Sequence, residues 1–317
     1  MLNRLRALFF SKPAEDLKRI RKTSRKLSVA RLMGLGEASG SFSLSGLMTD
    51  QGPVRLFGYY SADGVRYALE ALGIFSILEG KGYQDLSVSL SGNAFTQDIR
   101  IHGRSGGLAH LLVEGRFRRT SWSFPRAAYP DCKPPRQNLQ VVHIEWFLLQ
   151  NPTARFTDER PRLPGQKHPG LGLRDQVLEL FQVVARRLAL DAYVAQAKLF
   201  HNAFMYSPMF FFTDPNRQAE LDAIRAKAEG ATLQDITLAV EGGFLRKNGQ
   251  PYQWKGAEMI HPLSESLARV FRECNYQGRV ADLAAGMRFE FAWEAYRRNK
   301  ADLEGRALNL EMERPGV

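Results

Sequence analysis

The residues best suited to chemistry lie between Leu139 and Phe212. Within this stretch, residues 166–172 read Gln-Lys-His-Pro-Gly-Leu-Gly and precede a segment with helical periodicity. Glycines let a ligand approach the backbone amides closely, and the start of a helix carries unpaired N–H groups and partial positive charge. Lys167 and His168 add cationic or hydrogen-bonding side chains. The stretch therefore predicts a site for a phosphate or pyrophosphate group, although a tight loop before a helix can need glycines without any ligand.

The elements around this loop have to position it. Leu139–Leu149 is almost continuously apolar, which is typical of a central strand covered on both faces. Asn151-Pro152 ends the strand. Beyond the loop, the pattern predicts a helix over 173–189, a strand over 192–197, a short helix over 200–206 and a strand over 209–212.

This order resembles the core of the GNAT superfamily of acyl-CoA-dependent N-acyltransferases. In that family a central strand leads into a Gln/Arg-x-x-Gly-x-Gly/Ala loop at the start of a helix, and the loop holds the CoA pyrophosphate. A splayed strand follows, and then a short helix with an Asn and a Tyr, which match Asn202 and Tyr206. The chain has one residue more between Gln166 and Gly170 than the family pattern. The resemblance implies that acetyl-CoA or another acyl-CoA binds as co-substrate to Gln166, Lys167, His168, Gly170, Leu171, Gly172 and Asn202.

The resemblance also implies a base that deprotonates the acceptor amine and an acid that protonates the departing thiolate. Glu145 and His143 would share one face of the strand, and an apolar setting raises the pKa of a carboxylate. Tyr206 matches the family tyrosine that protonates the CoA thiolate. Structural roles stay open: Glu145 in an ion pair with a His or Arg, Tyr206 as a packed aromatic residue, and His201 as a capping or packing residue.

Positive charge is concentrated near the N-terminus. The chain of 317 residues has a formal net charge of +11, which favours encounters with polyanions. Apolar residues spaced among the cations predict an amphipathic helix from Pro13 to Met33, ended by Gly34 and Gly36. This arm would either lie on an anionic membrane surface or other polyanion, or pack its leucines on the body of the protein. Much of the positive charge of this stretch is carried by Lys12, Lys18, Arg19, Arg21, Lys22, Arg25, Lys26 and Arg31.

These patterns predict an α/β fold with a mixed central sheet flanked by helices, GNAT-like in its middle part. The predicted division is a basic amphipathic arm over 1–38, a GNAT-like domain over 39–215 and a mostly helical extension over 216–317. The other predicted strands cover 54–60, 85–90, 96–102 and 108–119, and the other predicted helices cover 63–79, 216–229, 232–240 and, with an interruption near Gly286, 280–308. A turn-rich hairpin is predicted over 242–254.

Several classes of protein lack support in the sequence. No stretch approaches the roughly 20 apolar residues of a membrane span. Cys132 and Cys274 are far apart in the sequence, so we expect no disulfide framework, a reducing compartment and a cytoplasmic protein, with peripheral membrane association through the arm as an option. No metal-ligand spacing and no Gly-x-Ser-x-Gly motif occurs, so we expect neither a metal site nor a serine hydrolase.

Two functions from different classes follow. The first is an acyl-CoA-dependent N-acyltransferase, in particular an N-acetyltransferase, that acts on a small-molecule or protein amine. The second is a catalytically inactive GNAT-like binding or scaffold protein that docks on an anionic partner through its basic arm. The sequence identifies neither the acceptor nor the role of the C-terminal region.

Overall fold

The computed structural model describes residues 15–35, 53–129, 132 and 138–309. These residues belong to two compact units, each assembled from separate stretches of chain. Unit 1 comprises residues 1–120, 142–155 and 168–189, and unit 2 comprises residues 121–141, 156–167 and 190–317. The predicted arm falls in unit 1, but its residues 1–14 and 36–38 lie outside the described ranges.

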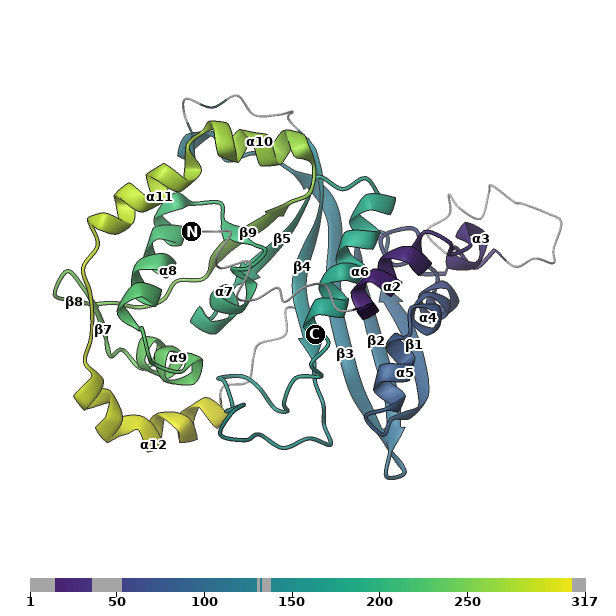
Figure 1. The fold of residues 1–317 in the computed structure, drawn as a ribbon, viewed down its shortest axis with the longest axis horizontal. Helices are drawn as coiled ribbons and strands as arrows, with labels where there is room; N and C mark the ends of the chain where they lie inside the picture. The colour runs from purple at the N-terminus through teal and green to yellow at the C-terminus, as the bar shows by residue number, and fades with distance from the viewer. Residues whose placement is uncertain (1–14, 36–52, 130–131, 133–137, 310–317) are drawn as a thin grey trace. The chain divides into compact units, whose positions relative to one another are not determined.

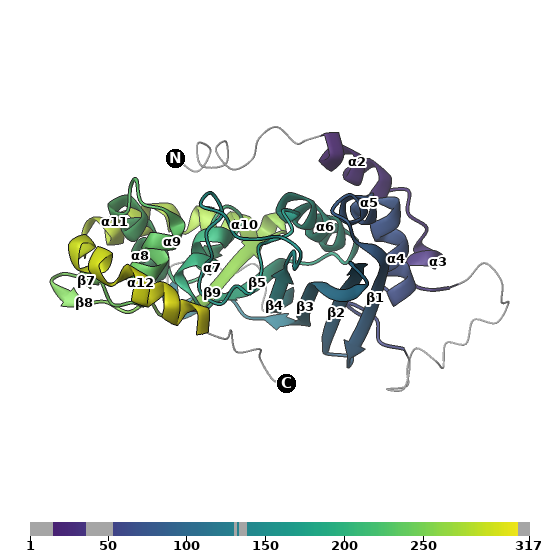
Figure 2. The same cartoon turned by 90° about the horizontal axis from the view of Figure 1, so that it is seen from below.

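Unit 1 contains antiparallel strands with helices on one face (Figure 2). Its elements are α2 (Glu15–Ser24), α3 (Val29–Leu32), α4 (Ala62–Ala71), α5 (Ile74–Glu79), β1 (Gln84–Gly92), β2 (Thr96–Ser105), β3 (Leu108–Trp122, to Thr120 in this unit), β4 (Leu139–Leu149, from Val142 in this unit) and α6 (Arg174–Arg187). The strands β1, β2 and β3 are antiparallel, and β4 lies next to β3. Along β2, Gln97, Ile99 and Ile101 are buried and alternate with partly exposed neighbours, as one covered face requires. Figure 2 shows α2, α5 and α6 on the same side of the strands.

The turns of unit 1 explain where the sequence predictions succeeded and failed. Gly106 and Gly107 both have positive φ between β2 and β3, which suits a tight hairpin. The helix predicted over 63–79 is two helices, because Gly73 adopts φ +77° between α4 and α5. The strand predicted over 54–60 is wrong: Phe57 and Gly58 also have positive φ, and the chain turns back so that Leu56 bridges Tyr60.

The described part of the arm, residues 15–35, forms two short helices instead of one. Ser28 caps α3, its hydroxyl accepting a hydrogen bond from the Arg31 amide, and this cap separates α3 from α2. The apolar residues Ile20, Leu27 and Leu32 are buried. They therefore pack on unit 1, which is the second of the two arrangements that the sequence left open.

Unit 2 combines three strands of the main sheet with a helical region. Its elements are β5 (Ala192–Ala197), α7 (Phe200–Tyr206), β6 (Phe211–Phe212), α8 (Pro215–Lys227), α9 (Leu233–Glu241), β7 (Leu245–Lys247), β8 (Gln250–Pro251), β9 (Ala257–Pro262), α10 (Glu265–Glu273), α11 (Tyr276–Ala285), β10 (Phe289–Phe291) and α12 (Trp293–Asn309), with a short 3-10 turn at Arg126–Ala128. Helices α8 and α11 lie side by side (Figure 1). An aromatic cluster of Phe124, Tyr129, Phe271 and Tyr276 fills the core beside them.

The seven strands of the main sheet follow the order β1-β2-β3-β4-β5-β9-β6, and a smaller sheet has the order β10-β7-β8. The predicted mixed sheet flanked by helices is confirmed at this level. The sequence patterns missed β9 and α10. The interruption predicted near Gly286 is confirmed, because α11 ends at Ala285 with Gly286 as its C-cap, but the strand β10 between α11 and α12 was missed.

One covalent link contradicts the sequence analysis. Cys132 and Cys274 form a disulfide within unit 2, with their Cα atoms 5.7 Å apart, although 142 residues separate them. The expectation of no disulfide rested on this sequence separation, which the fold removes. Among the described residues, no helix is both long and apolar enough to cross a membrane.

Candidate functional site

The glycine loop of unit 1 is anchored by alternate residues. Pro169 and Leu171 are buried, whereas Gly170 and Gly172 are exposed between and after them. The amide of Asn151, just past β4, donates to the Pro169 carbonyl at 2.7 Å. A Cβ built on Gly170 would lie 3.7 Å from the Leu149 carbonyl oxygen. The loop therefore lies at the carboxyl end of β4 with both glycine backbones turned outward.

The helix that follows starts without a side-chain cap. The residue before α6 is the buried Leu173, which offers no hydrogen bond to the first turn. Gly172 has φ +70°, and nothing lies within 4 Å of the position of its absent Cβ. Exposed amides at an uncapped helix start suit an anion. In the first turn, the carboxylate of Asp175 is paired with Arg174 at 3.1 Å.

Gln166 and Lys167, the first two residues of the predicted loop, belong to unit 2. The side-chain oxygen of Gln166 accepts a hydrogen bond from the Leu163 amide at 3.2 Å, and its carbonyl accepts one from Arg162. Gln166 thus closes a turn with Arg162 and Leu163, the residues that precede it. Lys167 is exposed and His168, in unit 1, is half-buried.

The two candidate bases of unit 1 share an arginine. Arg118 on β3 donates to the Glu145 carboxylate at 2.8 Å, so the structure contains the Glu–Arg pair that the sequence left as an alternative. The pKa of His143 is lowered by burial and by the positive charge of Arg118, against a smaller opposing effect of Glu145. His143 is therefore neutral at pH 7 and able to accept a proton. Arg118 was missed in the sequence because its contact with Glu145 depends on how β3 and β4 pair.

Helix α7 of unit 2 carries the other predicted residues. Burial raises the pKa of Tyr206, whose ring packs against Phe210 with centroids 5.9 Å apart. Its hydroxyl is thus protonated at neutral pH. Asn202 is half-buried in the first turn. Beside it, His201 is 2% exposed, its Nδ1 has no hydrogen-bond partner among the described residues, and burial lowers its pKa to about 4.

The predicted residues therefore fall into two sets. Unit 1 holds His143, Glu145 and the loop from His168 to Gly172, whereas unit 2 holds Gln166, Lys167, Asn202 and Tyr206. The first set has exposed glycine backbones and a neutral histidine, and the second has a protonated phenol.

Comparison with known proteins adds no family to these observations. No protein-family model matches the chain, and no curated protein matches it either.

Proposed function

We propose that the protein is an acyl-CoA-dependent N-acyltransferase that moves an acyl group, in the first place acetyl, to an amine. The observation that carries the proposal is the loop between β4 and α6. Its glycine backbones are exposed at the end of a strand, and they lead into a helix with no side-chain cap. Backbone N–H groups of this kind hold pyrophosphate through hydrogen bonds and the helix dipole.

The element order supports the same proposal. From β4 the chain runs through the glycine loop to α6, β5, α7 and β6, which is the order that the resemblance to the GNAT superfamily requires. In the sheet, β9 lies between β5 and β6 and pairs antiparallel with both.

The roles proposed for individual residues follow from their protonation. His143 is neutral, so it is the better proton acceptor of the two candidates on β4. Glu145 is paired with Arg118, and it would orient the His143 ring or balance positive charge near it. Tyr206, kept protonated by burial, would donate a proton to the CoA thiolate. On this proposal Tyr206→Phe lowers kcat and leaves acyl-CoA affinity nearly unchanged.

The test is a calorimetric titration of CoA and acetyl-CoA into the full chain and two variants of Gly170. This position has room for a side chain and lacks the positive φ that would strain one. We expect Gly170→Glu to abolish binding by placing a carboxylate among the amides, and Gly170→Gln, which has the same size without the charge, to weaken it far less. Absence of binding to the unchanged protein, or equal losses in both variants, would refute a pyrophosphate site at this loop.

A further inference from the structure

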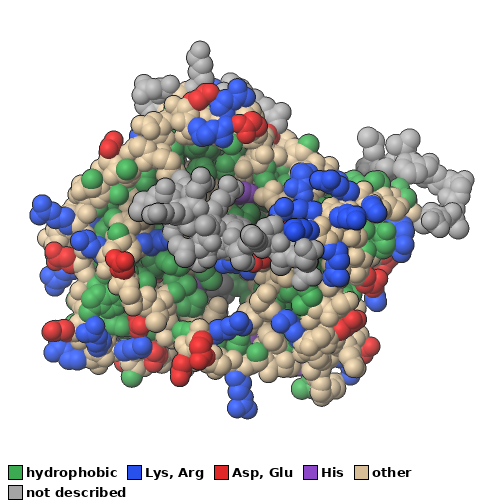
Figure 3. Space-filling view, in the orientation of Figure 1, with side chains coloured by type: hydrophobic (Ala, Val, Ile, Leu, Met, Phe, Trp, Pro, Cys, Tyr) green, Lys and Arg blue, Asp and Glu red, His purple; other side chains and the backbone are tan. Residues whose placement is uncertain are grey.

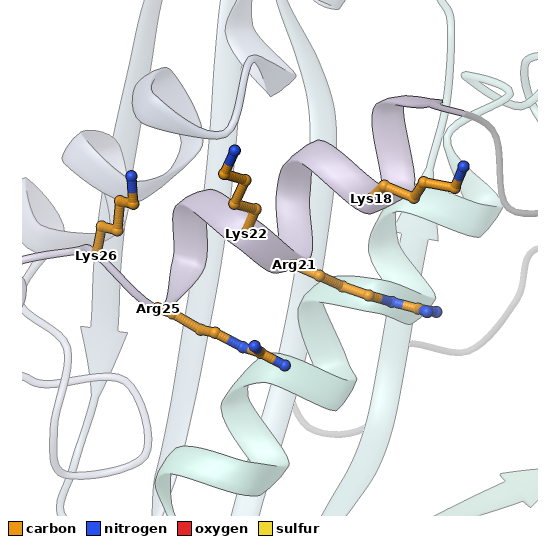
Figure 4. Close-up of a pocket in the computed structure, with 5 residues that line it drawn as sticks. All are labelled: Lys18, Arg21, Lys22, Arg25 and Lys26. Carbon is orange, nitrogen blue, oxygen red and sulfur yellow. The ribbon is translucent and has the colours of Figure 1, made fainter.

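Unit 1 also carries a cationic surface on α2, which packs against α6. Helix α2 and the two residues after it surround a hollow of about 360 Å³. Figure 4 shows that Lys22 and Lys26 extend to one side of α2, whereas Arg21 and Arg25 extend over α6. Lys and Arg side chains gather over α2 in the space-filling view (Figure 3). The residues that line the hollow are Lys18, Arg21, Lys22, Arg25 and Lys26.

This surface is cationic because the apolar residues of the same segment face inward. Ile20, Ser24 and Leu27 are 1%, 5% and 8% exposed, and Arg187 at the end of α6 donates to the Ser24 carbonyl at 3.0 Å. The packing of α2 on unit 1 therefore fixes which side chains face solvent. It also leaves no apolar stripe on α2 to enter a lipid bilayer, which an amphipathic membrane helix needs.

Few acidic groups neutralise the surface. Glu179 on α6 is 4% exposed and pairs with Arg21 at 2.7 Å and with Arg186 at 3.5 Å. Within the described ranges, no acidic side chain forms an ion pair with Lys22, Arg25 or Lys26. The surface thus combines one arginine held in place by a buried carboxylate with three exposed cations that form no ion pair with the part of the chain that the structure describes.

We propose that this surface binds the phosphate backbone of a nucleic acid. The cations lie on α2 and on the turn that follows it, so several of them can contact successive phosphates of one strand. Contacts of this kind carry no sequence information. Binding through α2 is therefore independent of base sequence and sensitive to salt, because each neutralised phosphate releases counterions.

The experiment measures fluorescence anisotropy of a labelled 20-nucleotide RNA of mixed sequence with the full chain between 50 and 200 mM salt. The variant Lys22→Gln/Arg25→Gln/Lys26→Gln removes three phosphate contacts. Its log–log salt slope should be shallower by about 2, so the unchanged protein loses about fifteen-fold more affinity than the variant over this range. The stronger variant Lys22→Glu/Arg25→Glu/Lys26→Glu should abolish binding.

A matched control separates this surface from overall charge. Arg246→Gln/Arg297→Gln/Arg298→Gln removes the same charge from exposed positions of unit 2 and should keep the affinity and salt slope of the unchanged protein. The proposal is overturned if the α2 variants bind RNA normally or if the control weakens binding equally. It is also overturned if the unchanged protein binds vesicles containing 30% phosphatidylserine but not RNA. Titration with acetyl-CoA in parallel tests the acyltransferase proposal separately, so that a failure of one proposal can be distinguished from a failure of the other.

Discussion

Units 1 and 2 accommodate charged groups in different ways. In unit 1, charges on neighbouring strands form pairs across the sheet. Arg116 on β3 donates to Asp98 on β2 through two hydrogen bonds of 2.7 and 3.0 Å, and Arg100 on β2 donates to Glu114 on β3 at 2.9 Å. Opposite charges therefore lie next to each other across the sheet.

In unit 2, burial shifts the pKa values of several groups in the direction that favours their neutral forms. It lowers the pKa of His201 to about 4 and raises the pKa values of Asp222, Glu241 and Glu258. Buried groups with shifted protonation are more characteristic of functional sites than compensated surface pairs are. We therefore expect salt to act on the paired charges of the unit 1 sheet, and pH and redox conditions to act on the buried groups and the disulfide of unit 2.

The largest expected effect concerns the disulfide of unit 2, which joins the two cysteines of the chain. Its ring closes over 142 residues. In the chain-entropy treatment, Cys132→Ser/Cys274→Ser lowers the free energy of unfolding of unit 2 by about 5 kcal/mol. Denaturation with guanidinium chloride measures this difference in the free energy of unfolding. A reductant should destabilise the unchanged protein by a similar amount and leave the double variant unaffected; equal responses of the two proteins would contradict the role given to this link.

A smaller effect is expected from His201 on acidification. Its folded-state pKa of about 4 lies below the ordinary value of 6.5, so the unfolded chain takes up the proton first. The contribution of His201 is therefore complete above pH 6.5 and is lost as the pH falls toward 4, by about 3 kcal/mol.

The raised pKa values of Asp222, Glu241 and Glu258 act in the opposite direction, so the measured quantity is the difference between the unchanged protein and His201→Gln. Denaturant unfolding followed by tryptophan fluorescence at pH 7 and pH 4.5 provides it. The free energy of unfolding of the variant should fall less on acidification. Parallel pH profiles would mean that His201 is not held neutral by unit 2.

The sequence was most informative where a pattern is local. The bounds of β4, β5 and α7 agree with the predicted ranges, because each is a continuous apolar or helical run between turn residues. The missed strand β9 pairs with β5, which lies some 60 residues earlier, so only the tertiary fold identifies it. The disulfide and the contact of Arg118 with Glu145 depend on the fold in the same way. The glycine loop was found because its residues are contiguous.

The smallest expected effect compares two ion pairs within unit 1. The pair of Asp98 and Arg116 is partly buried and has two hydrogen bonds, whereas Arg66 and Glu70 form a single exposed contact of 2.8 Å on α4. Double-mutant cycles with Asp98→Asn/Arg116→Gln and Arg66→Gln/Glu70→Gln should give coupling energies of about 1.5 kcal/mol and about 0.4 kcal/mol. In 1 M salt the Debye length is about 3 Å, so the exposed pair should lose most of its coupling energy. The partly buried pair in the sheet should keep more of its coupling energy. Equal couplings would mean that the paired charges of unit 1 are ordinary surface contacts, and the contrast between the two units would then rest on unit 2 alone.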